Sequence, residues 1–186
     1  AAVKLIHLHH PLDVAMQAAL TRHMLHGRYI FGFGSGFPSP LFSAERGLSY
    51  EARYERMRES LDFILKCWTH PEPFDWNGRH WRGKGVVALP KPETLPPMAT
   101  ATETDSSIAE AAAKGWTLLS AFIEPAAHVR RKADKYAAAA RAAGRASPRR
   151  DFAASRIVYI ARTLQQAKDE MRAAVAYEVS VQAKRG

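Results

Sequence analysis

The chain has 186 residues, of which 47% are hydrophobic and 24% charged, values that suit one soluble globular domain and exclude a disordered chain. No run approaches the roughly 18 apolar residues that cross a bilayer, and the first residues lack a charged leader, so we expect a cytoplasmic protein. The single cysteine, Cys67, excludes a disulfide framework, while the net charge of +9 raises nucleic acid as a partner.

The first residues of the chain are predicted to form a strand, a helix and a second strand. Residues 3–8 alternate apolar and polar side chains and stop at Pro11, which predicts a short strand. Residues 12–25 repeat small and apolar side chains at helical spacing and end before Gly27, as helices do. Residues 28–33 are aromatic and β-branched, which predicts a buried strand that leads into a glycine-rich loop.

A long amphipathic helix is predicted after Ser49, its N-cap, and before Pro71. We expect its apolar stripe inside, and on the outside the charged side chains of Arg53, Glu55, Arg58, Glu59 and Asp62. A hairpin is expected next, because Asn77-Gly78 is a typical turn between aromatic residues. Its aromatic side chains could line a pocket or form a core beneath the hairpin: Phe74, Trp76, His80 and Trp81.

Strands and helices alternate again in the second half of the chain. Strands are predicted at 98–102, 116–122 and 152–161, and helices at 107–114, 126–143 and 164–183. Such alternation indicates a parallel sheet, either open or closed into a barrel. A closed eight-stranded barrel takes about 250 residues. If this chain forms a barrel, the barrel is therefore incomplete and contains about five strand–helix units. No internal repeat or linker divides the chain, so we expect one domain over residues 1–186.

The loop Gly32-Phe33-Gly34-Ser35-Gly36 is the first candidate site, because glycines let a ligand approach the backbone. A dinucleotide fingerprint is disfavoured, since prolines follow where a helix should begin. The loop could equally be a plain turn.

The second candidate, residues 102–107, joins a predicted strand to the start of a helix. Hydroxyls and free amides at a helix N-terminus form a natural phosphate site, although Ser, Thr and Asp are also ordinary capping residues. The carboxylates of Glu103 and Asp105 would repel a phosphate unless they point away.

Two further signals favour structural roles. Strand alternation would place His7 and His9 on one face and His10 on the other, but no acidic or cysteine partner has ligand spacing, so no metal is expected. The basic stretch 128–150 lies largely on a predicted helix, whose outward face is charged in any case, and no nucleic-acid module is recognisable.

Four stretches taken in order resemble the bacterial-luciferase-like flavin-dependent monooxygenases over nearly the whole chain. They are HHPLDVAMQAALTRHMLHGRYIFGFGSGF, RESLDFILKCW, PEPFDWNGRHWRGKGVVALPKP and ATETDSSIAEAAAKGWTLLSAF. The resemblance implies a TIM barrel, of which this chain would hold the third strand through the seventh helix. An isolated segment of this kind is expected to be inactive and to associate with other copies through its unpaired sheet edges.

The resemblance also implies a function. Reduced flavin mononucleotide (FMN), supplied by a separate NAD(P)H-dependent reductase, would react with O2 to oxygenate a small apolar substrate. A related branch uses a deazaflavin and hydride transfer instead, and a non-catalytic flavin-holding or nucleic-acid-binding domain is a further alternative.

Site residues follow from the same resemblance. Glu103, Thr104 and Ser107 match the family's phosphate-binding turn, and Ser120 would lie at the next strand end. Ala2 and Val3 match a strand end against the flavin ring. Gly34 and Ser35 match a strand rim where relatives often have an arginine, a pattern from which Ser35 departs. The family's usual catalytic histidine has no counterpart in this chain, so no catalytic residue is assigned.

Overall fold

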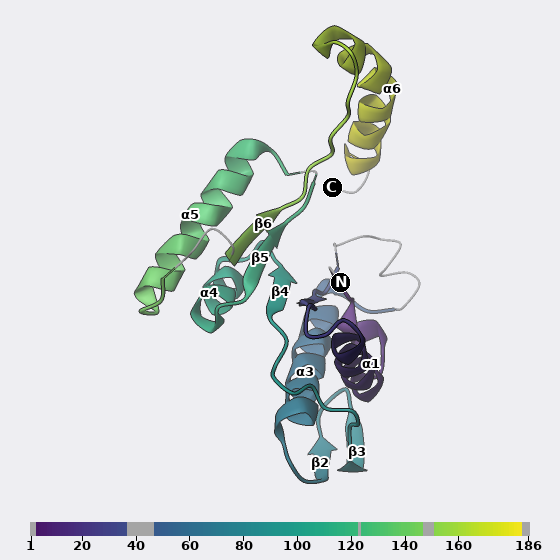
Figure 1. The fold of residues 1–186 in the computed structure, drawn as a ribbon, viewed down its shortest axis with the longest axis vertical. Coiled ribbons are helices and arrows are strands. Elements are labelled where there is room, and N and C mark those ends of the chain that lie inside the picture. The colour runs from purple at the N-terminus through teal and green to yellow at the C-terminus, as the bar shows by residue number, and fades with distance from the viewer. Residues whose placement is uncertain (1–2, 37–46, 123, 147–150, 184–186) are drawn as a thin grey trace.

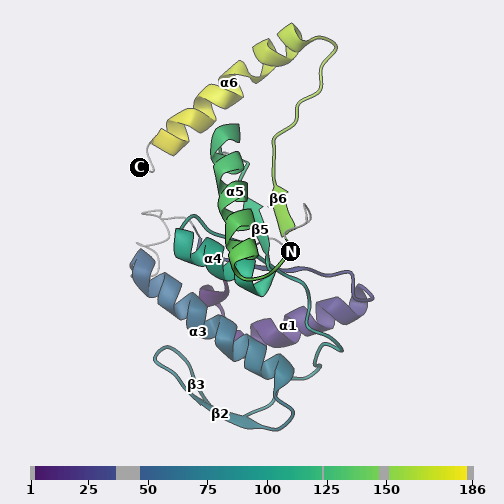
Figure 2. The same cartoon turned by 90° about the vertical axis from the view of Figure 1, so that its left-hand side faces the viewer.

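A parallel sheet flanked by helices forms the body of the protein, as Figures 1 and 2 show. The computed structural model describes residues 3–36, 47–122, 124–146 and 151–183. The elements, in chain order, are η1 (Ile6–Leu8), α1 (Pro11–Met24), β1 (Phe31–Phe33), α3 (Tyr50–Thr69), β2 (Phe74–Asn77), β3 (Arg82–Val86), β4 (Met98–Ala101), α4 (Asp105–Lys114), β5 (Thr117–Ser120), α5 (Ala126–Ala142), β6 (Phe152–Ala154) and α6 (Leu164–Ala183).

The main sheet has the strand order β1-β4-β5-β6, with every pair parallel. Lys4 adds a parallel bridge to Phe33 on the free side of β1. Each strand therefore lies beside the next one along the chain, apart from the hairpin β2–β3, which forms a separate two-stranded sheet. This stepwise order is that of an unfinished barrel, and it confirms the predicted α/β class.

Helix α3 contributes much of the core. Met57, Leu61, Ile64 and Trp68 of its predicted stripe are buried, and the Trp68 indole donates a hydrogen bond of 3.0 Å to the carbonyl of Ala15 in α1. Cys67 is buried on the same helix, and burial raises the pKa of its thiol to about 11. The cysteine is therefore a core residue with little thiolate.

The outer face of α3 differs from its prediction at Arg53, which is buried. Its guanidinium lies 3.8 Å from where a Cβ on Gly36 would stand, because the first turns of α3 pack beside the loop after β1. The periodicity of one helix could not reveal this neighbour.

All five strands predicted for the main sheet are shorter than expected, the first and the last most of all. Residues 6–8 form the 3-10 helix η1, so Lys4 alone of residues 3–8 pairs with the sheet. Strand β6 ends at Ala154, and beyond it the chain runs out to α6, which stands apart from the sheet (Figures 1 and 2). Residues 157–160 are apolar but exposed. Although their β-propensity is high, no described strand lies beside them for pairing. None of the helices in the described ranges is long and apolar enough to cross a bilayer.

The hairpin aromatics form a core against α3, which resolves the two interpretations of that segment. The Phe63 ring lies 5.1 Å from Trp76 and 5.8 Å from Phe74 between ring centroids. Glu59 fixes the hairpin by accepting hydrogen bonds from the Trp76 indole at 3.1 Å and from the amides of His80 and Trp81, both at 2.9 Å.

Replacing Glu59 with glutamine should therefore loosen the hairpin. We expect the free energy of unfolding to fall by about 1.5 to 3 kcal/mol, because three donors lose a charged acceptor. Urea unfolding of the chain measures this change. In the control variant Glu55→Gln, which removes an exposed pair with Arg79, the loss should stay under about 1 kcal/mol. Equal losses in the two variants would show that Glu59 does not anchor the hairpin.

A second prediction concerns His7, which is 1% exposed. Burial, together with the nearby Arg53, Arg56 and His9, lowers its pKa from 6.5 to about 4. The unfolded chain therefore binds a proton first as the pH falls, so stability should drop from about pH 6.5 downward, by up to roughly 3 kcal/mol at pH 4. The variant His7→Gln should flatten this dependence, and the exposed His26→Asn should leave it unchanged. Parallel pH profiles of wild type and His7→Gln would contradict the prediction.

Candidate functional site

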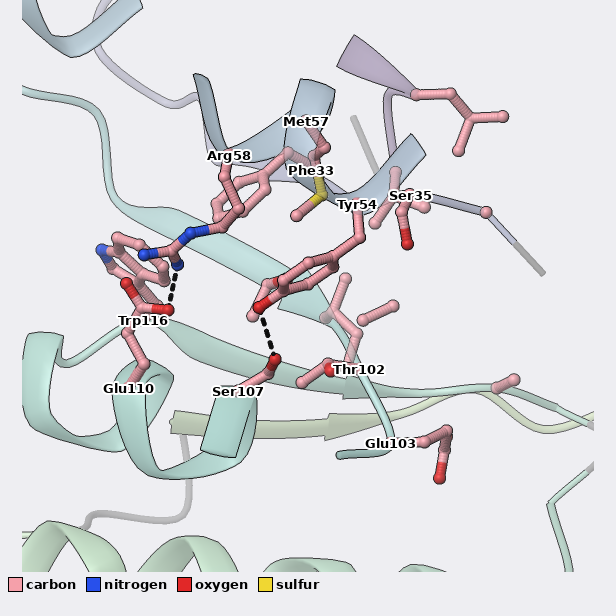
Figure 3. Close-up of a pocket in the computed structure, with 18 of the residues that line it drawn as sticks. Phe33, Ser35, Tyr54, Met57, Arg58, Thr102, Glu103, Ser107, Glu110 and Trp116 are labelled. Atoms are coloured by element: carbon pink, nitrogen blue, oxygen red, sulfur yellow. Dashed lines mark hydrogen bonds and ion pairs between the residues drawn. The ribbon is translucent and has the colours of Figure 1, made fainter. Parts of the chain in front are cut away.

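The loops that follow β1, β4 and β5 lie at one edge of the sheet, because parallel strands end on the same side. They border a cavity of about 330 Å³ (Figure 3). Helices α3 and α4 close its other side through the Tyr54–Ser107 hydrogen bond and the Arg58–Glu110 ion pair. The described residues at its wall include Val3, Phe33, Gly34, Ser35, Tyr54, Met57, Arg58, Thr102, Glu103, Ser107, Glu110, Trp116, Leu119, Glu124 and Lys132.

The start of α4 carries the clearest polar feature of the cavity. Thr104 is the N-cap, and its hydroxyl accepts a hydrogen bond of 3.3 Å from the amide of Ser107. The Ser107 hydroxyl lies 2.9 Å from both the Thr104 hydroxyl and the Tyr54 phenol. Capping and ligand binding are thus compatible here, because Thr104 caps the helix while the side chain of Ser107 borders the cavity.

The two carboxylates of this turn are paired with cations on α5. Glu103 accepts a hydrogen bond of 2.7 Å from Lys132 and lies 2.9 Å from His128. Asp105 pairs with Lys135 at 2.6 Å. Glu103 is therefore held toward the buried Lys132, whereas the exposed Asp105 is screened by solvent.

Ser120 and Glu124 form a second polar group just after β5. The Ser120 hydroxyl and the Ala121 amide donate hydrogen bonds of 2.7 and 2.6 Å to Glu124, and Lys132 adds a third of 3.2 Å. Burial raises the pKa of Glu124, but these three donors outweigh it and the pKa is lowered, so the carboxylate is charged at neutral pH. The Ser120 side chain is buried against Glu124 and does not border the cavity.

Three of the residues predicted to bind flavin lie at strand ends on the other side of the cavity. Val3, Gly34 and Ser35 all border it, and a Cβ on Gly34 would lie 3.6 Å from Val3 and 3.8 Å from the Ala101 carbonyl. Ala2 lies outside the described residues. The cavity wall therefore includes five of the seven predicted binding residues, and the other two, Thr104 and Ser120, are hydrogen-bonded to residues of that wall.

The contributions of α3 and α5 to the cavity, and that of Glu110 in α4, were not predicted from the sequence. Tyr54 and Met57 look like ordinary core residues, and Arg58 looks like an exposed one, because a helical stripe does not identify its neighbour. Arg58 pairs with Glu110, whose pKa is raised by burial but lowered more by Lys114 and Arg58. Lys132 was expected on a solvated face and is buried instead.

Two histidines of the first segment take structural positions. His7 is buried in η1, and His10 caps α1 by accepting a hydrogen bond from the Leu12 amide. Among the described residues, one group with metal-ligand atoms within 4.8 Å of one another does occur, namely Glu103, Glu124 and His128. The ammonium of Lys132 already contacts both of these carboxylates, which makes the group an ion-pair network with its own cation.

Known structures share this fold. The monooxygenase RslO1 from Streptomyces bottropensis superimposes with a TM-score of 0.82 at 26% identity, over 100% of this chain and 56% of that one. The oxygenating constituent of 3,6-diketocamphane monooxygenase from the CAM plasmid of Pseudomonas putida, solved with FMN, gives 0.75 at 25% identity, over 91% and 50%. An F420-dependent secondary alcohol dehydrogenase, at 18% identity and a TM-score of 0.67 over 87% and 49%, shares the fold.

The present chain thus spans about half the length of these structures. No curated protein matches it. Residues 1–185 match the sequence family described as luciferase-like monooxygenase. Together with the parallel barrel order of the strands, this match shows that the chain belongs to the luciferase-like monooxygenase family.

Proposed function

We propose that the protein is a reduced-FMN-dependent monooxygenase that oxygenates a small apolar organic molecule. The observation that carries the proposal is the cavity at the carboxyl edge of the sheet, with the Thr104 and Ser107 hydroxyls at the start of α4. Enzymes with parallel barrels place their active sites at this edge. The likeness to an FMN-bound monooxygenase constituent at 25% identity supports the same ligand here.

The residues present fit a flavin phosphate. A helix N-terminus offers free amides and a partial positive charge, and the Ser107 hydroxyl adds a donor at the cavity wall. The nearby Glu103 is paired with Lys132, and the exposed charge of Asp105 is screened by solvent, so neither strongly opposes an anion. Gly34, Ser35 and Val3 would border the ring system on the far side of the cavity. When bound, reduced flavin supplies the reaction with O2.

The substrate class follows from the rest of the wall. Phe33, Met57, Trp116 and Leu119 present apolar side chains to the cavity, and apolar walls with few polar groups are typical of small-molecule sites. A separate NAD(P)H-dependent reductase would supply the reduced flavin.

Equilibrium titration of the chain with reduced and oxidised FMN, riboflavin, the deazaflavin F420 and duplex DNA tests the cofactor. We expect FMN to bind more tightly than riboflavin and F420, because the α4 turn provides a phosphate site close to the ring. Tighter binding of F420 would favour hydride transfer, and salt-sensitive DNA binding without flavin binding would overturn the proposal.

The variant Ser107→Ala should weaken FMN more than riboflavin. A lost hydrogen bond to a charged group costs about 1.5 to 3 kcal/mol, which is roughly a ten- to hundredfold change in affinity. The helix should remain intact, because the cap belongs to Thr104. Ser106→Ala, in the same turn but exposed, is the matched control and should change neither affinity. Equal losses of FMN and riboflavin in Ser107→Ala would show that the phosphate lies elsewhere.

We further propose that copies of the chain associate. The side chains of Ile157, Val158 and Ile160 are 63%, 77% and 87% exposed in the stretch after β6, and exposed apolar clusters of this kind mark interaction surfaces. Light scattering should report a mass above that of the monomer, and replacing Val158 and Ile160 with serine should lower it. A monomeric wild-type chain would contradict the proposal.

A further inference from the structure

Lys132 on α5 is a buried charged side chain outside the α4 turn. Its side chain is 3% exposed, whereas His128 and Lys135, the other α5 side chains that pair with the turn, are 41% and 55% exposed. A buried ammonium is stable only when it is paired. Lys132 meets this requirement with two carboxylates, Glu103 at 2.7 Å and Glu124 at 3.2 Å.

These two carboxylates belong to different loops. Glu103 follows β4 and lies directly before the cap of α4, whereas Glu124 follows β5 and is tied to Ser120 and the Ala121 amide. Lys132 therefore joins the ends of two neighbouring strands from the side of α5. Both carboxylates border the same cavity as Ser107.

The charges of Lys132 and of its two carboxylate partners bear on anion binding at the start of α4. A phosphate at the start of α4 would lie near Glu103, and like charges at short range in a partly buried site repel strongly. In the structure Glu103 points away from Ser107 (Figure 3) and its oxygens meet Lys132 and His128. Lys132 thus removes an obstacle to anion binding.

We propose that Lys132 is a positioning residue for the anion site at the start of α4: it pairs with Glu103 and Glu124, holds both carboxylates toward α5, and so lowers the repulsion that a phosphate at the turn would meet. This inference rests on the proposed function. It differs from a direct role for Lys132 as a phosphate ligand, because its ammonium is already engaged with both carboxylates.

The test compares the ratio of riboflavin to FMN dissociation constants, which isolates the contribution of the phosphate. Lys132→Met should lower this ratio by about tenfold or more, because Glu103 is left charged and free to face the anion. The double variant Lys132→Met/Glu103→Gln should recover most of the loss. If Lys132 were itself a ligand, removing the Glu103 charge would restore nothing.

Two single variants keep the test independent of folding defects in Lys132→Met. Glu103 is half exposed, so Glu103→Gln should fold, and it should raise the ratio, because a negative charge near the phosphate disappears. A fall in the ratio would overturn the inference. Lys135→Met, which removes the exposed pair with Asp105, is the matched control and should change the ratio by no more than about twofold, since exposed charges are screened.

Failure of the inference and failure of the proposed function give different results. A wild-type chain that binds FMN no better than riboflavin contradicts the phosphate site and the role of Lys132 with it. A wild-type chain that prefers FMN, beside a folded Lys132→Met chain with the same preference, contradicts the role of Lys132 alone.

Discussion

Parallel pairing of β1, β4, β5 and β6 is the constraint on which the rest of the structure depends. Each strand must be followed by a crossover helix before the next can pair in the same direction. The loops after all these strands therefore gather at one edge, although they are far apart in the sequence. Gly34, Thr104 and Glu124 come to border or support one cavity for this reason alone.

The helices that satisfy this constraint also supply the electrostatics of the cavity. Helix α4 directs its N-terminus at the edge, which favours an anion, while α5 runs beside it and pairs its cations with the turn. Helix α3 contributes Tyr54 and Arg58, each bonded to a residue of α4. The outer layer of helices is thus part of the site. Some of the positive charges that give the net charge of +9 form ion pairs within the molecule.

Membership of the luciferase-like monooxygenase family agrees with this arrangement. The structures it matches are about twice as long. The exposed apolar residues after β6 and the isolated position of α6 are consistent with surfaces that further elements or a second copy would cover. The phosphate end of the proposed flavin site, in contrast, lies within elements that this chain contains.

The sequence by itself determined the element order, the long helix α3 with its buried stripe, and the hairpin, because local periodicity and turn chemistry specify these features. It also predicted the α4 turn, since capping residues are a local signal. The tertiary structure alone decided that residues 6–8 leave the sheet, that Arg53 and Lys132 are buried, and that Glu103 points toward α5. These outcomes depend on neighbours that are distant in sequence. A helical pattern predicts which face of the helix a residue lies on, but it does not identify the element that packs against that face.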